Sequence, residues 1–172
     1  SHGYSPPNID ETLDDKGLVN QNIKPESGWN YELGIRGNLV NGKVSYDINM
    51  YLMKIKNLLV AQRTSEDTYV GVNAGKTSHP GIELSINSFI WNSLDNKKNI
   101  TSEVFFSKNW HKFIEFVNEG NVYSNNYLTG VPLHTISKNI IFKINKFKGT
   151  INYQKTGKIP INDSNSEYSE PY

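Results

Sequence analysis

The feature that most constrains the fold is the strict alternation of apolar and polar side chains over residues 29–39. The apolar and polar residues fall on opposite parities: Trp29, Tyr31, Leu33, Ile35 and Leu39 against Asn30, Glu32, Arg36 and Asn38. A period of two indicates a β-strand with one apolar and one wet face. Asn41-Gly42 follows and favours a tight hairpin turn, because both residue types accept positive φ. A second alternating run opens at Val44, so we predict a long antiparallel hairpin.

The length of this hairpin indicates what its apolar face meets. Both strands are close to the roughly 9–11 residues that a tilted strand needs to cross a bilayer, whereas strands of soluble proteins usually have about five or six. A slip of one residue would turn Arg36 toward the apolar side, which costs about 2–4 kcal/mol at mid-bilayer. We therefore predict membrane-spanning strands. Four polar residues are expected to face a watery interior as structural side chains: Asn30, Glu32, Arg36 and Glu83.

Four further strands are predicted, and the connections between strands alternate in length. The expected strands cover residues 29–39, 43–60 (with a bulge near Met53), 69–91, 100–117, a fifth after Pro132 that includes residues 136–144, and 150–154. Short turns are expected at residues 41–42, 93–99 and 145–148. Long connections are expected at residues 1–26, 63–76, 118–129 and after 157. Transmembrane barrels have this asymmetry, with short periplasmic turns and long external loops.

We therefore predict an all-β fold, an antiparallel up-and-down transmembrane β-barrel segment of six strands. Several aromatic residues fall toward strand ends and fit the interfacial girdle of such a barrel: Trp29, Tyr31, Tyr46, Trp91, Trp110 and Tyr153. The general preference of aromatic residues for strands explains each single ring equally well.

Composition excludes several classes of protein. The net charge of +1 argues against a nucleic-acid surface. There is no cysteine, which excludes disulfide scaffolds and thiolate metal sites. The mean hydropathy of −0.57 is polar for a membrane protein, but a barrel with a wet interior carries its membrane signal in alternation rather than in average hydropathy.

Two motifs in order point to a known family. Ile-Lys-Pro-Glu at residues 23–26 with Trp-Asn-Tyr-Glu-Leu-Gly-Ile-Arg-Gly at 29–37 closely resembles a segment late in the barrel of TonB-dependent outer-membrane receptors, especially siderophore receptors. Asn-Ala-Gly-Lys-Thr at 73–77, followed by Gly-Ile-Glu-Leu at 81–84, looks like a second signature of that family. Further phrases at residues 3–7, 128–132 and 157–163 follow in the expected order. The resemblance covers nearly the whole chain.

The resemblance implies a bacterial outer-membrane receptor. It implies a barrel of about twenty-two strands around a plug, with residues 1–172 supplying six strands from the later part of the barrel wall, and the plug and the barrel closure outside this chain. The plug, with its TonB box, contacts the TonB complex in the periplasm, and the resemblance implies that the inner-membrane proton gradient energises uptake through TonB. The implied cargo is a ferric siderophore, so iron enters only as part of a transported chelate and no resident cofactor is expected. Cobalamin, heme or an oligosaccharide are alternative cargoes.

Candidate ligand-binding residues are aromatic, basic or imidazole side chains in the expected external loops: Tyr4, Arg63, Tyr69, His79, Tyr123 and Tyr127. The four histidines lie on four separate segments without ligand spacing, so no metal site is predicted. Glu11 with Asp14-Asp15 reads as a solvated loop rather than a calcium site. No catalytic arrangement is found, and we expect no enzyme. A soluble all-β carbohydrate-binding module is the alternative from another class, and an enzyme on a β scaffold has the least support.

Overall fold

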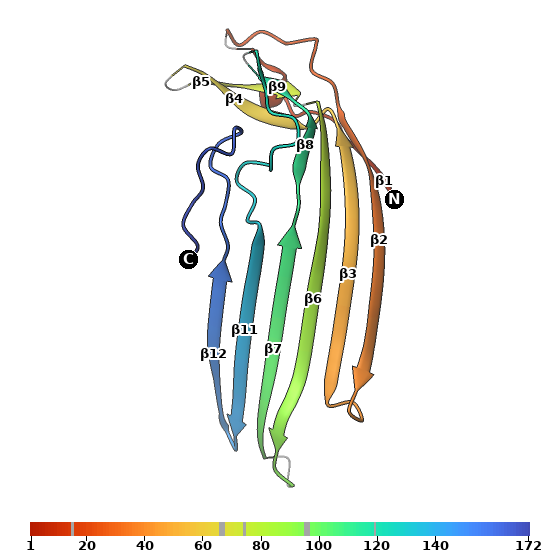
Figure 1. The fold of residues 1–172 in the computed structure, drawn as a ribbon, viewed down its shortest axis with the longest axis vertical. Helices are drawn as coiled ribbons and strands as arrows, with labels where there is room; N and C mark the ends of the chain where they lie inside the picture. Colours follow the sequence, from red (N-terminus) through yellow and green to blue (C-terminus); the bar gives the residue numbers. More distant parts are fainter. Residues whose placement is uncertain (15, 66–67, 74, 95–96, 119) are drawn as a thin grey trace.

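A computed structural model covers the chain and describes residues 1–14, 16–65, 68–73, 75–94, 97–118 and 120–172, without the side chains of residues 61–69. Its main element is an antiparallel sheet with the order β1-β2-β3-β6-β7-β11-β12, and β8 pairs with the upper part of β6 (Figure 1). The strands of this sheet are β1 (His2–Ser5), β2 (Glu26–Leu39), β3 (Val44–Lys56), β6 (Lys76–Asn92), β7 (Lys98–Asn109), β8 (Lys112–Glu115), β11 (His134–Ile144) and β12 (Phe147–Thr156). The described residues form no helix long and apolar enough to cross a membrane.

The remaining elements are small and lie at one end of the main sheet (Figure 1). They are the 3-10 helix η1 (Asp10–Thr12) and two hairpins, β4 (Leu59–Ser65) with β5 (Thr68–Asn73), and β9 (Val117–Asn118) with β10 (Asn121–Val122). We call this end the loop end. The opposite end holds the β2–β3, β6–β7 and β11–β12 connections, and we call it the turn end. The predicted sorting of short and long connections to opposite ends is confirmed.

The predicted hairpin is confirmed in its register. Leu33 pairs with Met50 and Ile35 with Ile48, so the apolar side chains of both strands share one face. Asn41 and Gly42 have φ of 53° and 82° at the turn, as the Asn-Gly pair predicts. Val40 before them also has a positive φ, of 54°, which the pair does not predict. The same face continues across the sheet, because Ile48 pairs with Leu84 on β6.

Five expectations about the strands need correction. Residues 2–5, expected in a loop, form β1 and pair with β2. The expected strand 43–60 is divided into β3 and β4, 69–91 into β5 and β6, and 100–117 into β7, β8 and β9. No bulge occurs at Met53, because β3 pairs regularly with both neighbours through Lys56. Met53 and Ile55 appear out of phase because they lie on the polar face, where they line a groove beside β1.

The main sheet is a single layer with its apolar residues exposed. Leu33 and Ile35 are 71% and 59% exposed, and no second sheet packs on them in the part of the chain that the structure describes. The buried core is small and lies at the loop end, where Phe113, Phe116 and Leu128 are contacted by Leu58, Val60, Tyr123 and Val131. A soluble sandwich would bury the apolar face between two sheets, so the sandwich alternative does not fit this architecture.

Candidate functional site

An open hollow of about 780 Å³ lies on the polar face of the main sheet. Charged and hydroxyl side chains from five strands line it, among them Glu32, Arg36, Asp47, Glu83, Ser107 and Ser137. All four residues predicted to be interior lie on this face. Asn30, Glu32 and Arg36 share one face of β2 with Gly34, which pairs with Asn49 on β3, and Asn49 in turn pairs with Glu83 on β6. The hollow is therefore a wet surface that can hold a polar filling or a passing solute.

Polar side chains on this face bond both within a strand and between strands. Within β2, Asn30 Nδ2 donates to Glu32 Oε1 at 2.5 Å. Between strands, Arg36 Nε on β2 lies 4.0 Å from Asp47 Oδ2 on β3. Both partners of the Arg36–Asp47 pair are largely exposed, so the pair contributes little stability. Nearer the turn end, Asn152 donates to Asn139, which donates to Glu103 Oε2 at 2.9 Å. The contacts from Asn152 through Asn139 to Glu103 brace three neighbouring strands, β12, β11 and β7.

The two sequence motifs meet at the loop end. Asn73 Nδ2 donates to the carbonyl oxygens of Lys24 and Asn57, and Asn73 Oδ1 accepts from the Lys24 amide at 2.9 Å. Glu26 Oε1 accepts from the Leu59 amide at 2.7 Å. The motif at residues 73–77 therefore ties the start of β2 to the end of β3, and this explains physically why the two motifs occur together.

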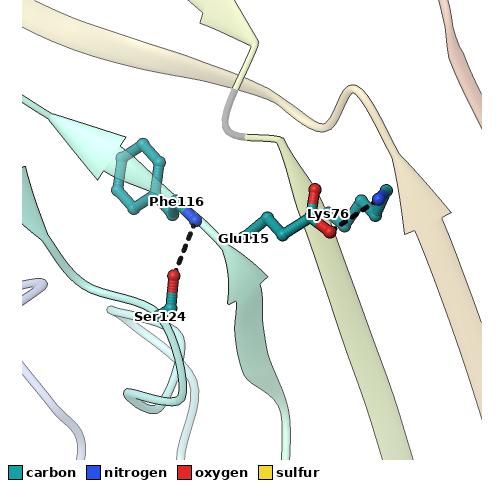
Figure 2. Close-up of polar contacts among 4 residues, drawn as sticks. All are labelled: Lys76, Glu115, Phe116 and Ser124. Carbon is teal, nitrogen blue, oxygen red and sulfur yellow. Dashed lines mark hydrogen bonds and ion pairs between the residues drawn. The ribbon is translucent and has the colours of Figure 1, made fainter.

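A second set of contacts ties β8 to the start of β6. Figure 2 shows Lys76 and Glu115 facing each other, with Lys76 Nζ 2.6 Å from Glu115 Oε1, and the Phe116 amide donating to Ser124 Oγ. Gly75 precedes this ion pair with φ of +66°, and a Cβ placed there would lie 2.0 Å from the backbone oxygen of Glu115. Glycine is required at this position because the two backbones approach so closely.

Asn73→Ala is expected to loosen the loop end. The substitution removes three hydrogen bonds that join separate segments, at about 1–3 kcal/mol for the backbone groups left without a partner. Proteolytic cleavage of the loops in the folded full-length protein should become several-fold faster. Asn121→Ala, at an exposed position on β10, is the matched control. Equal cleavage of the two variants would contradict the role of Asn73.

The structure separates the predicted ligand-binding residues. Tyr4 pairs with Ser27, so it lies on the face of Trp29, opposite the hollow, and its side chain is 66% exposed. Arg63 and Tyr69 are paired in the β4–β5 hairpin, and their side chains lie outside the described residues. Tyr123 packs its ring 5.9 Å from that of Phe116. Tyr127 lies beneath Lys112 Nζ at 4.9 Å.

His79 lies within β6 rather than in a loop, and the strand register gives it an unexpected neighbour. Its side chain is only 9% exposed, and its ring centroid lies 4.8 Å from that of His111, which follows the end of β7. Tyr51 on β3 joins them, with its hydroxyl 3.3 Å from His111 Nε2. Burial lowers the pKa of His111 below its ordinary value, so the ring is neutral at pH 7.

Sequence reasoning missed this cluster, since its members are far apart in the chain. The one available signal was in the strand pattern. Tyr51 and Met53 lie two residues apart on one face of β3, and the register places His79 opposite Met53 on the same face. A second missed feature joins the last segment to the loop end: the Tyr127 amide donates to Asn165 Oδ1 at 2.6 Å, and Asn165 Nδ2 donates back to the Tyr127 carbonyl. Residues 157–172 thus belong to the loop end.

The comparisons with known proteins decide the family. The family model described as TonB dependent receptor-like, beta-barrel, matches residues 1–172. This chain belongs to the TonB-dependent receptor barrel family. The family consists of transport receptors of the bacterial outer membrane, which confirms the resemblance, the fold class and the location expected from the sequence. No curated protein sequence matches the chain.

Solved structures give the same fold for this receptor segment. It is similar to the ferric yersiniabactin uptake receptor FyuA from Yersinia pestis, with 20% identity and a TM-score of 0.71 over 100% of this chain and 25% of that one. It is similar to the copper transporter OprC with 14% identity and a TM-score of 0.73, over 99% of this chain and 26% of that one. It is similar to the RagAB peptide transporter with 13% identity and a TM-score of 0.61, over 95% of this chain and 25% of that one. The chain thus spans about a quarter of the length of these transporters, and the likeness establishes the fold.

Membership of the family assigns the two ends and the two faces of the receptor sheet. Long loops of outer-membrane barrels lie outside the cell and short turns in the periplasm, which makes the loop end external. The apolar face, with exposed Leu33, Ile35 and Met50, is the one that suits lipid, and the hollowed polar face suits the interior.

Proposed function

We propose that residues 1–172 form part of the wall and external loops of a receptor that imports a ferric siderophore. The wall would belong to a barrel of about twenty-two strands whose plug and closing strands lie outside these residues. A TonB complex would energise uptake through that plug. Iron would pass only as the transported chelate.

The observation that carries this proposal is that the elements of the loop end, which we call the loop layer, lie at one end of the sheet whose polar face carries the hollow (Figure 1). The loop layer has its own core of Phe113, Phe116 and Leu128, and its motifs bond to the ends of β2 and β3. A packed layer above a wet interior can first hold a bulky solute and then pass it inward. The siderophore cargo is supported by the motifs at residues 23–37 and 73–84, which resemble those of siderophore receptors.

The ligand contacts we propose are the candidates on the loop layer and the polar face: His79, Tyr123 and Tyr127, with Arg63 and Tyr69 on the β4–β5 hairpin. Aromatic rings supply large contact area at a low cost in conformational entropy. Tyr4 has its ring on the opposite face, which makes Tyr4→Ala a control for loss of a tyrosine at the same end of the receptor.

Growth of a deletion strain on single iron sources tests the proposal. A strain without the full-length gene should lose growth on one ferric chelate and regain it when the gene is restored. Restoring the gene with Tyr127→Ala should weaken uptake of that chelate, while Tyr4→Ala should leave it at the level of the intact gene. Unchanged uptake of every ferric chelate in the deletion strain would overturn the siderophore assignment. Parallel cultures on cobalamin, heme and oligosaccharides test the alternative cargoes.

A further inference from the structure

His79 and His111 form a pair on the polar face, between the hollow and the external loops. His79 lies on β6 and His111 in the short connection after β7, and the pairing of β6 with β7, in which Gly81 lies opposite Asn109, brings them together. Gly81 also has the Tyr51 ring directly over it, since a Cβ there would lie 2.3 Å from the ring. The absence of a side chain at position 81 lets the Tyr51 hydroxyl reach Asn109 Oδ1 at 3.0 Å and His111 Nε2 at 3.3 Å.

The spacing of the two imidazoles suits a shared metal ion. Two imidazole nitrogens bound tetrahedrally to one ion at about 2.0–2.1 Å place their ring centroids about 5 Å apart. The observed separation is 4.8 Å, with the rings tilted by 56°. Both rings are partly or fully shielded from solvent, and a neutral imidazole is the form that binds metals.

Each ring also has an oxygen partner that fixes its orientation. His79 Nε2 lies 2.8 Å from Thr77 Oγ1, and His111 Nε2 lies 3.3 Å from the Tyr51 hydroxyl. Metal-binding histidines almost always bond through the second ring nitrogen to an oxygen, which holds the tautomer and aims the ligand nitrogen. Thr77 is 1% exposed, so its hydroxyl is held firmly beside His79.

We propose that His79 and His111 bind one divalent late transition-metal ion on the interior wall of the receptor, near its external mouth. The described residues contain no group of three or more His, Cys, Asp or Glu side chains that could hold a metal, so water or a group of the passing solute completes the coordination. Imidazole ligands suit copper, nickel and zinc, and Cu²⁺ binds most tightly of these. The site stands independently of the siderophore assignment, since it needs only these side chains.

Copper binding to the full-length receptor, purified in detergent without a polyhistidine tag, tests the site. Titration calorimetry with Cu²⁺ gives the affinity, and electron paramagnetic resonance of the bound ion reports nitrogen ligands. The intact receptor should bind one Cu²⁺ with couplings from two imidazoles. His79→Ala and His111→Ala should each weaken binding at least tenfold and remove one nitrogen coupling. His2→Ala, on β1 beside Trp29, is the matched control and should leave both readouts unchanged.

Tyr51→Phe distinguishes loss of the site from loss of the fold, because the ring over Gly81 stays and only the hydroxyl is removed. Weakening of the Cu²⁺ affinity by about 10–100-fold is expected, the usual effect of removing an orienting partner. Circular dichroism of each variant checks that the barrel is folded. The proposal is overturned if the intact receptor binds no Cu²⁺ at micromolar concentration, or if folded His79→Ala and His111→Ala bind it with unchanged affinity and spectrum. Siderophore uptake is measured in a separate growth assay. Failure of the copper-binding proposal therefore does not decide the siderophore proposal, and failure of the siderophore proposal does not decide copper binding.

Discussion

Ile48→Arg is expected to destabilise the receptor by about 2–4 kcal/mol, the cost of an arginine on the lipid face near the bilayer midplane. Ile48 lies within β3, paired with Ile35 on β2 and Leu84 on β6. All three side chains share the apolar face, and no second sheet covers that face in the described part of the chain. A guanidinium placed there has lipid and apolar neighbours in place of water, so the loss of stability is large.

Asn49→Arg is the matched control, one residue further along the same strand. Asn49 lies on the opposite face and lines the hollow, close to Glu32 and Glu83. An arginine at this position has water and carboxylates around it, so the change in the free energy of unfolding should stay below about 1 kcal/mol. Urea unfolding of the full-length receptor in lipid vesicles, followed by tryptophan fluorescence, measures both variants. Equal losses would show that the two faces are assigned wrongly.

Gly75→Ala is the second substitution with a large expected effect. The φ of +66° at Gly75 is strained for alanine, at about 1–3 kcal/mol. The added methyl would also lie 2.0 Å from the Glu115 backbone oxygen, which forces β8 away from the start of β6. The Lys76–Glu115 ion pair would open with it (Figure 2). We expect loss of the ordered loop layer together with the loss of stability.

Gly130→Ala separates the clash from the backbone strain. Gly130 also lies at the loop end with φ of +79°, but no atom lies within 4 Å of an added Cβ. It should therefore show only the cost of positive φ. Limited proteolysis of the loops and urea unfolding of the full-length receptor compare the two variants. If the loops of Gly75→Ala are cleaved no faster than those of Gly130→Ala, the close approach of β8 to Gly75 is not what holds the loop layer in place.

The long strands were predictable because lipid and water impose opposite demands on alternate residues. The alternation from Trp29 to Leu39 shows which side chains share a face of the strand without reference to any partner strand. The Asn41-Gly42 turn follows from local backbone energetics. The prediction failed where the environment changes along a strand. Met53 and Ile55 remain in register, yet their apolar side chains face the interior beside β1. If every apolar side chain of the strand is assumed to face lipid, the sequence pattern indicates a bulge at these two residues.

The loop end was the least predictable part, because its structure depends on contacts between distant segments. The roles of Asn73 and Glu26 require the start of β2 and the end of β3 to lie side by side. The divisions between β5 and β6 and between β7 and β8 depend on pairing in three dimensions, and their residues alternate poorly.

The sequence by itself determined the all-β class, the long hairpins, the lengths of the connections and the family, since these depend on side-chain periodicity, turn chemistry and local motifs. Only the tertiary structure decided that His79 meets His111, that Tyr4 faces away from the hollow, and that Gly75 lies against Glu115. The physical reason is that strand register brings together residues with no regular spacing along the chain, and one step of register moves a side chain to the other face.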